Sequence, residues 1–305
     1  MEQRMLAADR KKSFLFAGVA VLIWSTVATA FKLGLRELHY AQLIFIASGV
    51  SLLIFTVYLV FTGQLQQVFR STFREWLWSA TLGFLNPFAY YLIIFKSYSL
   101  LPAQIAQPLN MIWPLVLALL SVPLLKQSIS WKQFASLGVC FLGIVILSSQ
   151  GSLSGYRNTS FPGVLLAVGS SFFWALYWIL NVKDHRPEAI KLFQSFLFGF
   201  IYLLATLPFF SGFSFSWGIS LWAALYIGFF EVGITYLIWM RAMHLSDNNA
   251  LTGSLIYIAP FISLILISTV IGETIHFTTF LGLTLIASAI LYVQLSSKRK
   301  VTNDQ

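Results

Sequence analysis

The sequence predicts an all-α integral membrane protein with ten transmembrane helices, arranged as two inverted five-helix repeats. Three observations predict this fold. Of the 305 residues, 58% are hydrophobic and only 10% are charged, whereas soluble domains carry about 25% charged residues. Ten apolar stretches follow one another, most with short connections. The longest connection, 150–160, is rich in Gly and Ser and lies at the midpoint of the chain, as a linker between repeats would.

The predicted spans divide evenly between the two sides of this linker. The repeat 13–149 contains spans at 13–35, 40–62, 75–98, 102–125 and 131–149, and the repeat 161–296 contains spans at 161–182, 189–210, 216–245, 249–272 and 277–296. A stretch of about 20 apolar residues crosses a hydrocarbon layer of about 30 Å. Because each half has an odd number of spans, the second half begins on the opposite side of the membrane. Homologous halves would therefore be inverted repeats.

A few matching residues support the internal repeat. The sequence Tyr-Leu-Ile begins at Tyr91 in the third span and at Tyr236 in the eighth. The same register pairs Asn86 with Glu231. A chance match between apolar helices is the alternative, and the coincidence of rare polar residues argues against it.

Loop charges predict the topology. Of the 19 Lys and Arg residues, all but Lys32, Arg36, Lys96 and Arg157 fall on the side of the termini when the ten spans are threaded. Because cytoplasmic loops carry an excess of Lys and Arg, both termini are expected in the cytoplasm. The net charge of +9 is therefore interpreted as a topology signal, and no nucleic-acid partner is predicted.

Glu231 lies near the centre of the eighth span, the longest apolar run in the chain. A charge at mid-bilayer costs about 2.5–3.5 kcal/mol on insertion scales, so such a residue usually faces the bundle interior and marks a solute or proton path. A structural hydrogen-bond node between helices is the alternative. Thr235 is expected one turn further along on the same face. Gly228 and Gly233 allow close approach by another helix or a solute.

Further candidate substrate-binding residues are polar or aromatic side chains deep in the spans. They are Asn86 in the third span, Gln104, Gln107 and Asn110 in the fourth, Asn249, Thr252 and Tyr257 in the ninth, and the tryptophans Trp24, Trp113, Trp174 and Trp178. Prolines interrupt all three spans that carry these amides, and broken backbone beside the amide stripe of the fourth span favours a water-accessible cavity. Deep tryptophans favour the walls of a solute pocket. Helix–helix packing is the alternative for both groups.

No catalytic residue, metal site or cofactor is predicted. The four histidines are scattered without metal-ligand spacing, and no Walker A sequence is present. The ten acidic residues lie mostly in loops, which argues against a membrane-embedded enzyme that processes lipids. We therefore expect a protein that is not an enzyme.

Several segments resemble the drug/metabolite transporter superfamily, in its EamA-like branch. They are AVLIWSTVATAFK, AQPLNMIWPLVLALL, SSFFWALYWILNVK and the stretch that begins GFFEVGITYLIWMRAMHL. The resemblance covers about 13–296. It implies a central cavity formed by spans 1, 3, 4, 6, 8 and 9, with spans 5 and 10 at the periphery. It also implies export of small metabolites from bacteria across the inner membrane. Glu231 is not general in the superfamily, so its role rests on the charge argument alone.

Together these observations predict a secondary transporter that exports small organic metabolites, such as amino acids, by alternating access. Glu231 is expected to bind either a proton or the ammonium group of the solute. The expected partners are the solute, protons and the lipid bilayer. A monomer is expected, because ten spans can enclose a cavity. A passive facilitator or channel is the alternative function.

Overall fold

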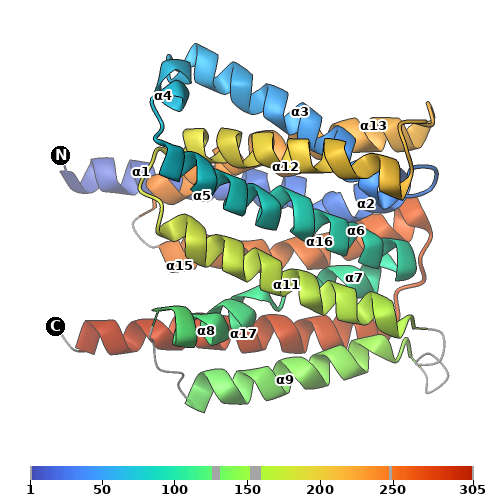
Figure 1. The fold of residues 1–305 in the computed structure, drawn as a ribbon. Helices are drawn as coiled ribbons and strands as arrows, with labels where there is room; N and C mark the ends of the chain where they lie inside the picture. The colour runs from blue at the N-terminus through green and yellow to red at the C-terminus, as the bar shows by residue number, and fades with distance from the viewer. Residues whose placement is uncertain (1, 126–130, 152–158, 247–248, 304–305) are drawn as a thin grey trace.

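The computed structural model describes residues 2–125, 131–151, 159–246 and 249–303, and it contains helices and no strand in these ranges. Eight helical segments among the described residues are long and apolar enough to cross a membrane, and 134–148 and 277–292 are shorter apolar helices. Each predicted span coincides with one of these segments. The prediction of an all-α, multi-pass membrane protein is therefore confirmed. Both termini lie at the same end of the bundle (Figure 1).

The first half of the chain forms five spans from nine helical elements. They are α1 (Glu2–Ser25) with α2 (Val27–Gly34), α3 (Tyr40–Phe61), α5 (Phe73–Gly83) with η1 (Phe84–Ala89) and α6 (Tyr90–Leu100), α7 (Ala103–Asn110) with α8 (Trp113–Leu125), and α9 (Trp131–Ser148). The short helix α4 (Leu65–Phe69) lies between the second and third spans. Proline interrupts the third and fourth spans, because its ring cannot donate the backbone hydrogen bond of a regular helix.

The second half forms the other five spans. They are α11 (Phe161–Val182), α12 (Glu188–Phe210), α13 (Ile219–Tyr226) with η2 (Ile227–Ile234) and α14 (Thr235–His244), α15 (Asn249–Ser254) with η3 (Leu255–Ile258), α16 (Ala259–Leu266) and η4 (Ile267–Ile271), and α17 (Phe277–Asn303). The elements η1, η2 and η4 are π-helical, and η3 is a 3₁₀-helix. The eighth span begins at Ile219, slightly later than the predicted 216.

Helices from the two halves pack against each other throughout the bundle. The main pairs are α3 with α12, α9 with α17, α1 with α14, and α6 with α11. In span numbers, these pairs are 2 with 7, 5 with 10, 1 with 8, and 3 with 6. When each span is replaced by its counterpart in the other half, the pair 1 with 8 becomes the pair 6 with 3. The pairs 2 with 7 and 5 with 10 map onto themselves. The helices α9 and α17 lie side by side at the edge of the bundle (Figure 1). The repeat boundaries and the linker remain predictions, and 152–158 lies outside the described residues.

Glycine allows α3 to approach the eighth span closely. A Cβ atom added at Gly228 would lie 2.5 Å from the backbone oxygen of Ala47. The Ser51 hydroxyl donates a hydrogen bond to the backbone oxygen of Gly228 over 2.8 Å. The predicted role of Gly228 in close helix packing therefore has a defined partner, α3.

A polar cluster ties the turn between α11 and α12 to α5. Arg186 donates hydrogen bonds to both carboxylate oxygens of Asp184, to the Ser79 hydroxyl at 2.9 Å, and to the side-chain oxygen of Gln194. Burial opposes ionisation of Asp184, but the hydrogen bonds and charge of Arg186 hold its pKa below the ordinary value. The cluster thus fixes the end of the bundle that carries the termini.

We expect Arg186→Ala to lower the free energy of unfolding by about 3 kcal/mol, because Asp184 and Gln194 lose their shared donor in a buried site. Thermal unfolding of the detergent-solubilised protein measures this loss. Arg36→Ala is the control on the other end of the bundle. A melting temperature unchanged by Arg186→Ala would show that the cluster contributes nothing to stability.

Candidate solute-binding cavity

A cavity of about 590 Å³ lies between the helices of the bundle. This volume is within the usual range for small-molecule sites, about 300–1,000 Å³. Its walls come from spans 1, 3, 4, 6, 8 and 9, with the start of α12 at one end. Lys183, which is exposed, and Glu188 line that end, so the cavity opens at the end of the bundle where the termini lie.

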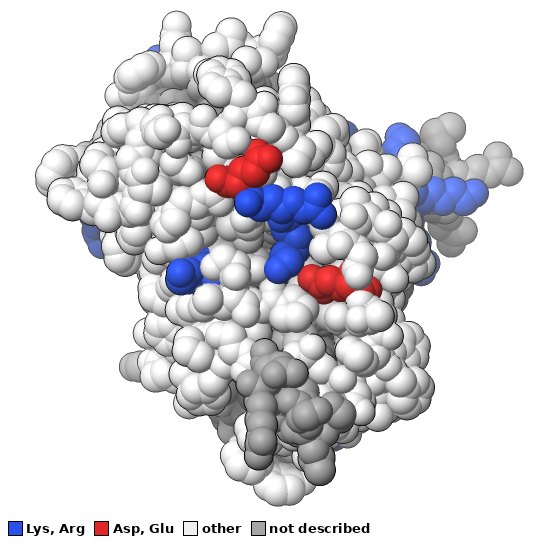
Figure 2. Space-filling view, turned by 90° about the vertical axis from the view of Figure 1, so that its right-hand side faces the viewer, with Lys and Arg blue, Asp and Glu red and all other residues white. Residues whose placement is uncertain are grey.

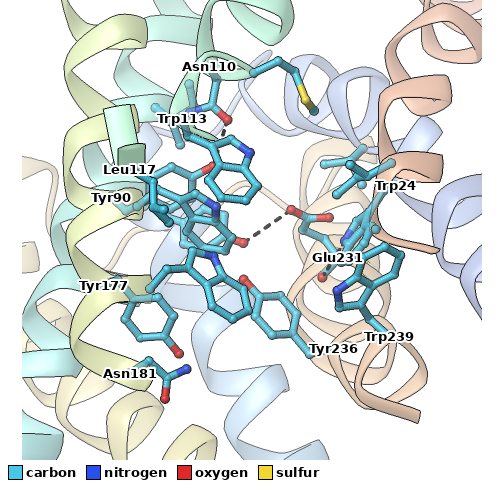
Figure 3. Close-up of a pocket in the computed structure, with 18 of the residues that line it drawn as sticks. Trp24, Tyr90, Asn110, Trp113, Leu117, Tyr177, Asn181, Glu231, Tyr236 and Trp239 are labelled. Carbon is cyan, nitrogen blue, oxygen red and sulfur yellow. Dashed lines mark hydrogen bonds between the residues drawn. The ribbon is translucent and has the colours of Figure 1, made fainter. Parts of the chain in front are cut away.

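Glu231 faces this cavity (Figure 3). Its Oε1 atom accepts a hydrogen bond from the Tyr91 hydroxyl over 3.3 Å, whereas its buried Oε2 atom has no hydrogen-bond partner. The Trp24 indole donates to the backbone oxygen of Glu231 over 3.3 Å. The carboxylate is therefore held at one oxygen, and its other oxygen is buried without a hydrogen-bond partner.

The π-helical turn η2 determines which neighbours share the face of Glu231. Thr235 is fully buried and does not line the cavity, contrary to the expectation from regular helical spacing. Tyr236, five residues after Glu231, does line it. In a π-helix the hydrogen bonds join residues five apart, so residues at this spacing replace those at spacing four on the same face. The irregular turn thus brings a tyrosine beside the carboxylate.

Aromatic rings form much of the cavity wall. Trp174 lies at the centre of this wall, with ring centroids 4.7 Å from Tyr90, 5.9 Å from Tyr177 and 6.4 Å from Tyr236. Trp24 packs on Trp239 at 5.1 Å, across the cavity from Tyr90 and Tyr177 (Figure 3). The aromatic lining residues are Trp24, Phe31, Tyr90, Tyr91, Tyr98, Trp113, Trp174, Tyr177, Trp178, Tyr236, Trp239 and Tyr257.

Several polar atoms of the cavity wall have no partner within the protein. They include the Gln107 side-chain oxygen, the Tyr236 hydroxyl and the Trp178 indole nitrogen. These atoms are buried, and a buried polar atom without a partner is unfavourable unless a ligand or a rearrangement satisfies it. Among the described residues, no three His, Cys, Asp or Glu side chains come together as metal ligands would.

The structure brings most of the predicted site residues to this cavity. In its wall are Glu231, Trp24, Gln107, Asn110, Trp113, Trp174, Trp178 and Tyr257. Outside it lie Asn86, Gln104, Thr235 and Thr252. The side chain of Asn249 is outside the described residues.

The residues outside the cavity have other surroundings. Gln104 donates to the backbone oxygen of Thr274 and accepts from the Thr279 hydroxyl, so this amide joins α7 to the segment before α17 and to its start. Thr252 is hydrogen-bonded to Ser246. These two side chains therefore join segments of the chain and do not face this cavity.

Asn86 is fully buried in η1 and does not line the cavity. A Cβ atom added at Gly199 of α12 would lie 2.5 Å from the neighbouring Pro87 ring. The kink after Asn86 therefore packs against α12. At this kink the Pro87 ring fills a space between helices.

Sequence reasoning missed several tyrosines of the site. Tyr91 and Tyr236 were recognised only as markers of the internal repeat, and both line the cavity beside Glu231. Tyr90 also lines it and donates to the side-chain oxygen of Asn110 over 3.1 Å. Tyr236 lies five residues after Glu231, and Tyr91 is its counterpart in the register that aligns the two halves. This closeness in sequence to the mid-span carboxylate could have identified the tyrosines.

The opposite end of the cavity is closed. Phe31 packs on Phe95 and Tyr98, with ring centroids 4.5 and 5.2 Å apart. Lys32 donates to the backbone oxygens of Tyr98 and Leu101, over 3.1 and 3.0 Å. Figure 2 shows this end of the bundle, where a few charged side chains gather near the middle of a mostly uncharged surface.

Glu273 completes this closure by capping α7. Its carboxylate accepts hydrogen bonds from the backbone nitrogens of Ala103 and Gln104, over 2.8 and 3.2 Å. The first N–H groups of a helix have no partner within it, and a carboxylate also suits the positive end of the helix dipole. The cap therefore joins the ninth span to the start of the fourth.

We expect Glu273→Ala to make the closed end more accessible, because α7 loses the cap that holds it there. The readout is maleimide labelling of Ala28→Cys, a residue of the cavity wall that makes none of these closing contacts, in a Cys140→Ser background and from the side opposite the termini. A capping carboxylate contributes about 1 kcal/mol, so labelling should rise about fivefold. Glu37→Ala lies outside the cap and is the control. Equal labelling of both variants would contradict a role of the cap in closure.

Comparisons with known proteins place this architecture in a family. The model of the EamA-like transporter family matches residues 11–149 and 161–295. An "Uncharacterized transporter" of Archaeoglobus fulgidus is 24% identical, over 89% of this chain and 93% of that protein. The "Aromatic amino acid exporter YddG" of Ancylobacter novellus is 26% identical, over 85% of this chain and 88% of that protein.

A solved crystal structure supports the fold alone. It superposes with a TM-score of 0.66 and 19% sequence identity, and the match covers 94% of this chain and 98% of that one. The family model, by contrast, matches most of the sequence in both halves of the chain. The protein is therefore a membrane protein with a transporter fold, and it belongs to the EamA-like transporter family.

Proposed function

We propose that the protein is a secondary transporter that exports small organic metabolites, such as amino acids, by alternating access of its central cavity. Glu231 binds a proton or the ammonium group of the solute in this proposal. The protein acts as a monomer in the bacterial inner membrane, with both termini in the cytoplasm. It has no enzymatic activity.

One observation carries this proposal: a solute-sized cavity is open at one end of the bundle, closed at the other, and contains a carboxylate at mid-span. A continuous pore would need both ends open, whereas alternating access needs one end closed at a time. The closure depends on a few contacts of Lys32, Phe31 and Glu273, which a modest helix movement can break. The relative from Ancylobacter novellus, named an aromatic amino acid exporter, supports an organic solute.

Proteoliposomes that contain the purified protein test the proposal. Uptake of a mixed panel of amino acids and amines is measured with and without an imposed pH gradient. Accumulation above the external concentration when the gradient is imposed, together with stimulation by unlabelled solute on the other side, is the expected result. Protein-free liposomes are the control.

Other outcomes would contradict the proposal in distinct ways. Equilibration without accumulation, and without stimulation from the other side, would indicate a passive facilitator. Chemical conversion of a panel member, detected by mass spectrometry, would indicate an enzyme. No movement of any panel member under either condition would reject transport of this solute class.

A further inference from the structure

In the described part of the chain, the middle of the cavity carries a negatively charged group and no positively charged side chain. Glu231 supplies a carboxylate at mid-span. Among the described residues of the cavity wall, Lys183 is the only basic side chain, and it is exposed at the open end. A solute carboxylate near Glu231 would therefore be repelled by the Glu231 carboxylate, and no positively charged side chain of the described cavity wall would lie beside it. A solute ammonium would be attracted.

The aromatic wall has the same preference. The face of a Trp or Tyr ring carries negative charge, so it attracts a cation placed within about 6 Å. Tyr91 donates to the carboxylate of Glu231, and Trp24 donates to the backbone oxygen of the same residue. Tyr236 packs against Trp24 and Trp174 in the same cavity wall. Aromatic rings in the same cavity wall as a carboxylate form an arrangement suited to organic cations, including quaternary ammonium groups.

The carboxylate also has capacity for a ligand. The Oε2 atom of Glu231 is buried and has no hydrogen-bond partner, and the Tyr91 hydroxyl occupies only Oε1. A buried carboxylate oxygen without a donor is unfavourable unless a ligand or proton satisfies it. An ammonium group would supply both the donor and the opposite charge.

We propose that the site selects a monovalent organic cation, an amine or quaternary ammonium with an apolar or aromatic body, over zwitterionic amino acids and organic anions. This inference rests on the proposed function and narrows its substrate class from small organic metabolites to organic cations, so the amino acids given there as an example would be weak ligands. The cationic group contacts Glu231 and the rings of Trp24, Tyr91 and Tyr236. The apolar body lies toward Trp174.

Four probes that share a phenyl ring test the selectivity. They are 2-phenylethylamine, phenyltrimethylammonium, L-phenylalanine and 3-phenylpropionate, which differ in whether they carry a cationic group, a carboxylate or both. Their binding to the full-length protein in nanodiscs is measured by isothermal titration calorimetry. We expect both cations to bind about 10-fold more tightly than phenylalanine, and phenylpropionate to show no saturable binding.

Variants connect this ranking to the site. Glu231→Gln and Trp24→Leu should each weaken binding of phenyltrimethylammonium by about 10-fold. Glu37→Gln makes the same chemical change as the first variant outside the cavity, and should leave the affinity unchanged. If a variant does not fold, the ranking of the four probes on the unmodified protein still decides the question.

Binding and transport together separate this inference from the proposed function. Phenylalanine or phenylpropionate bound as tightly as the cations would overturn the inference, while transport of these probes would leave the transporter function intact. Cations bound with the expected ranking but not transported in proteoliposomes would reject the function and keep the cation site. Cation affinity equal in Glu231→Gln and the unmodified protein would overturn the inference as well.

Discussion

Glu231→Gln should abolish gradient-driven accumulation of solute in proteoliposomes. The substitution keeps the size of the side chain and its ability to accept from the Tyr91 hydroxyl, but removes the negative charge. Removing one partner of a buried charge pair costs about 2–5 kcal/mol, so the transport rate should fall about 100-fold. The same loss is expected whether the partner of the carboxylate is a proton or an ammonium group.

Two controls separate charge from structure in this experiment. Glu37→Gln removes a carboxylate that accepts from the Ser216 hydroxyl, outside the cavity wall, and should leave transport unchanged. Tyr91→Phe removes only the hydroxyl that holds Oε1 and should have a smaller effect, about 10-fold, because one hydrogen bond to a charged group is lost. Full gradient-driven transport by Glu231→Gln would show that Glu231 is a structural residue.

Gly228→Leu should prevent stable assembly of the bundle. A Cβ atom at this position would lie 2.5 Å from the Ala47 backbone oxygen and 2.7 Å from the Val50 Cβ, so α3 would have to move away from η2. That movement would also break the hydrogen bond from Ser51. Overpacking typically costs about 1–3 kcal/mol, and a leucine against backbone should reach or exceed the upper value.

The yield of monodisperse protein and its melting temperature measure this effect. Gly228→Ala should also lower the melting temperature, because the alanine Cβ atom alone would collide with the backbone of α3. Gly18→Ala is the matched control in α1, where an added Cβ atom meets nothing within 4 Å. In that helix the change should be neutral or stabilising by about 0.5–1 kcal/mol. Equal melting temperatures for the two alanine variants would contradict a close contact at Gly228.

Composition and the spacing of apolar stretches were sufficient to predict the fold class. A membrane accepts only segments that satisfy their own backbone hydrogen bonds, so long apolar runs such as 40–62 and 161–182 had to be helices. The positions of these helices agree with α3 and α11 within about two residues. Glu231 was predictable for the same reason, since a charge at mid-span needs a polar surrounding or a cavity.

Which side chains meet in the cavity was decided by tertiary structure. Regular helical spacing places Thr235 on the face of Glu231, but the π-helical turn η2 places Tyr236 there. The three amides of the fourth span also have different surroundings. Gln107 and Asn110 line the cavity, whereas Gln104 is hydrogen-bonded to Thr274 and to the start of α17.

The sequence by itself therefore determined that the chain crosses a membrane as helices and that it carries one carboxylate at mid-span, because both follow from the energy of apolar and charged groups in lipid. The tertiary structure decided that aromatic rings from both halves line the cavity that contains this carboxylate, and that one end of the cavity is closed by Lys32 and Glu273. These features depend on irregular turns and on contacts between distant segments, which local spacing cannot encode.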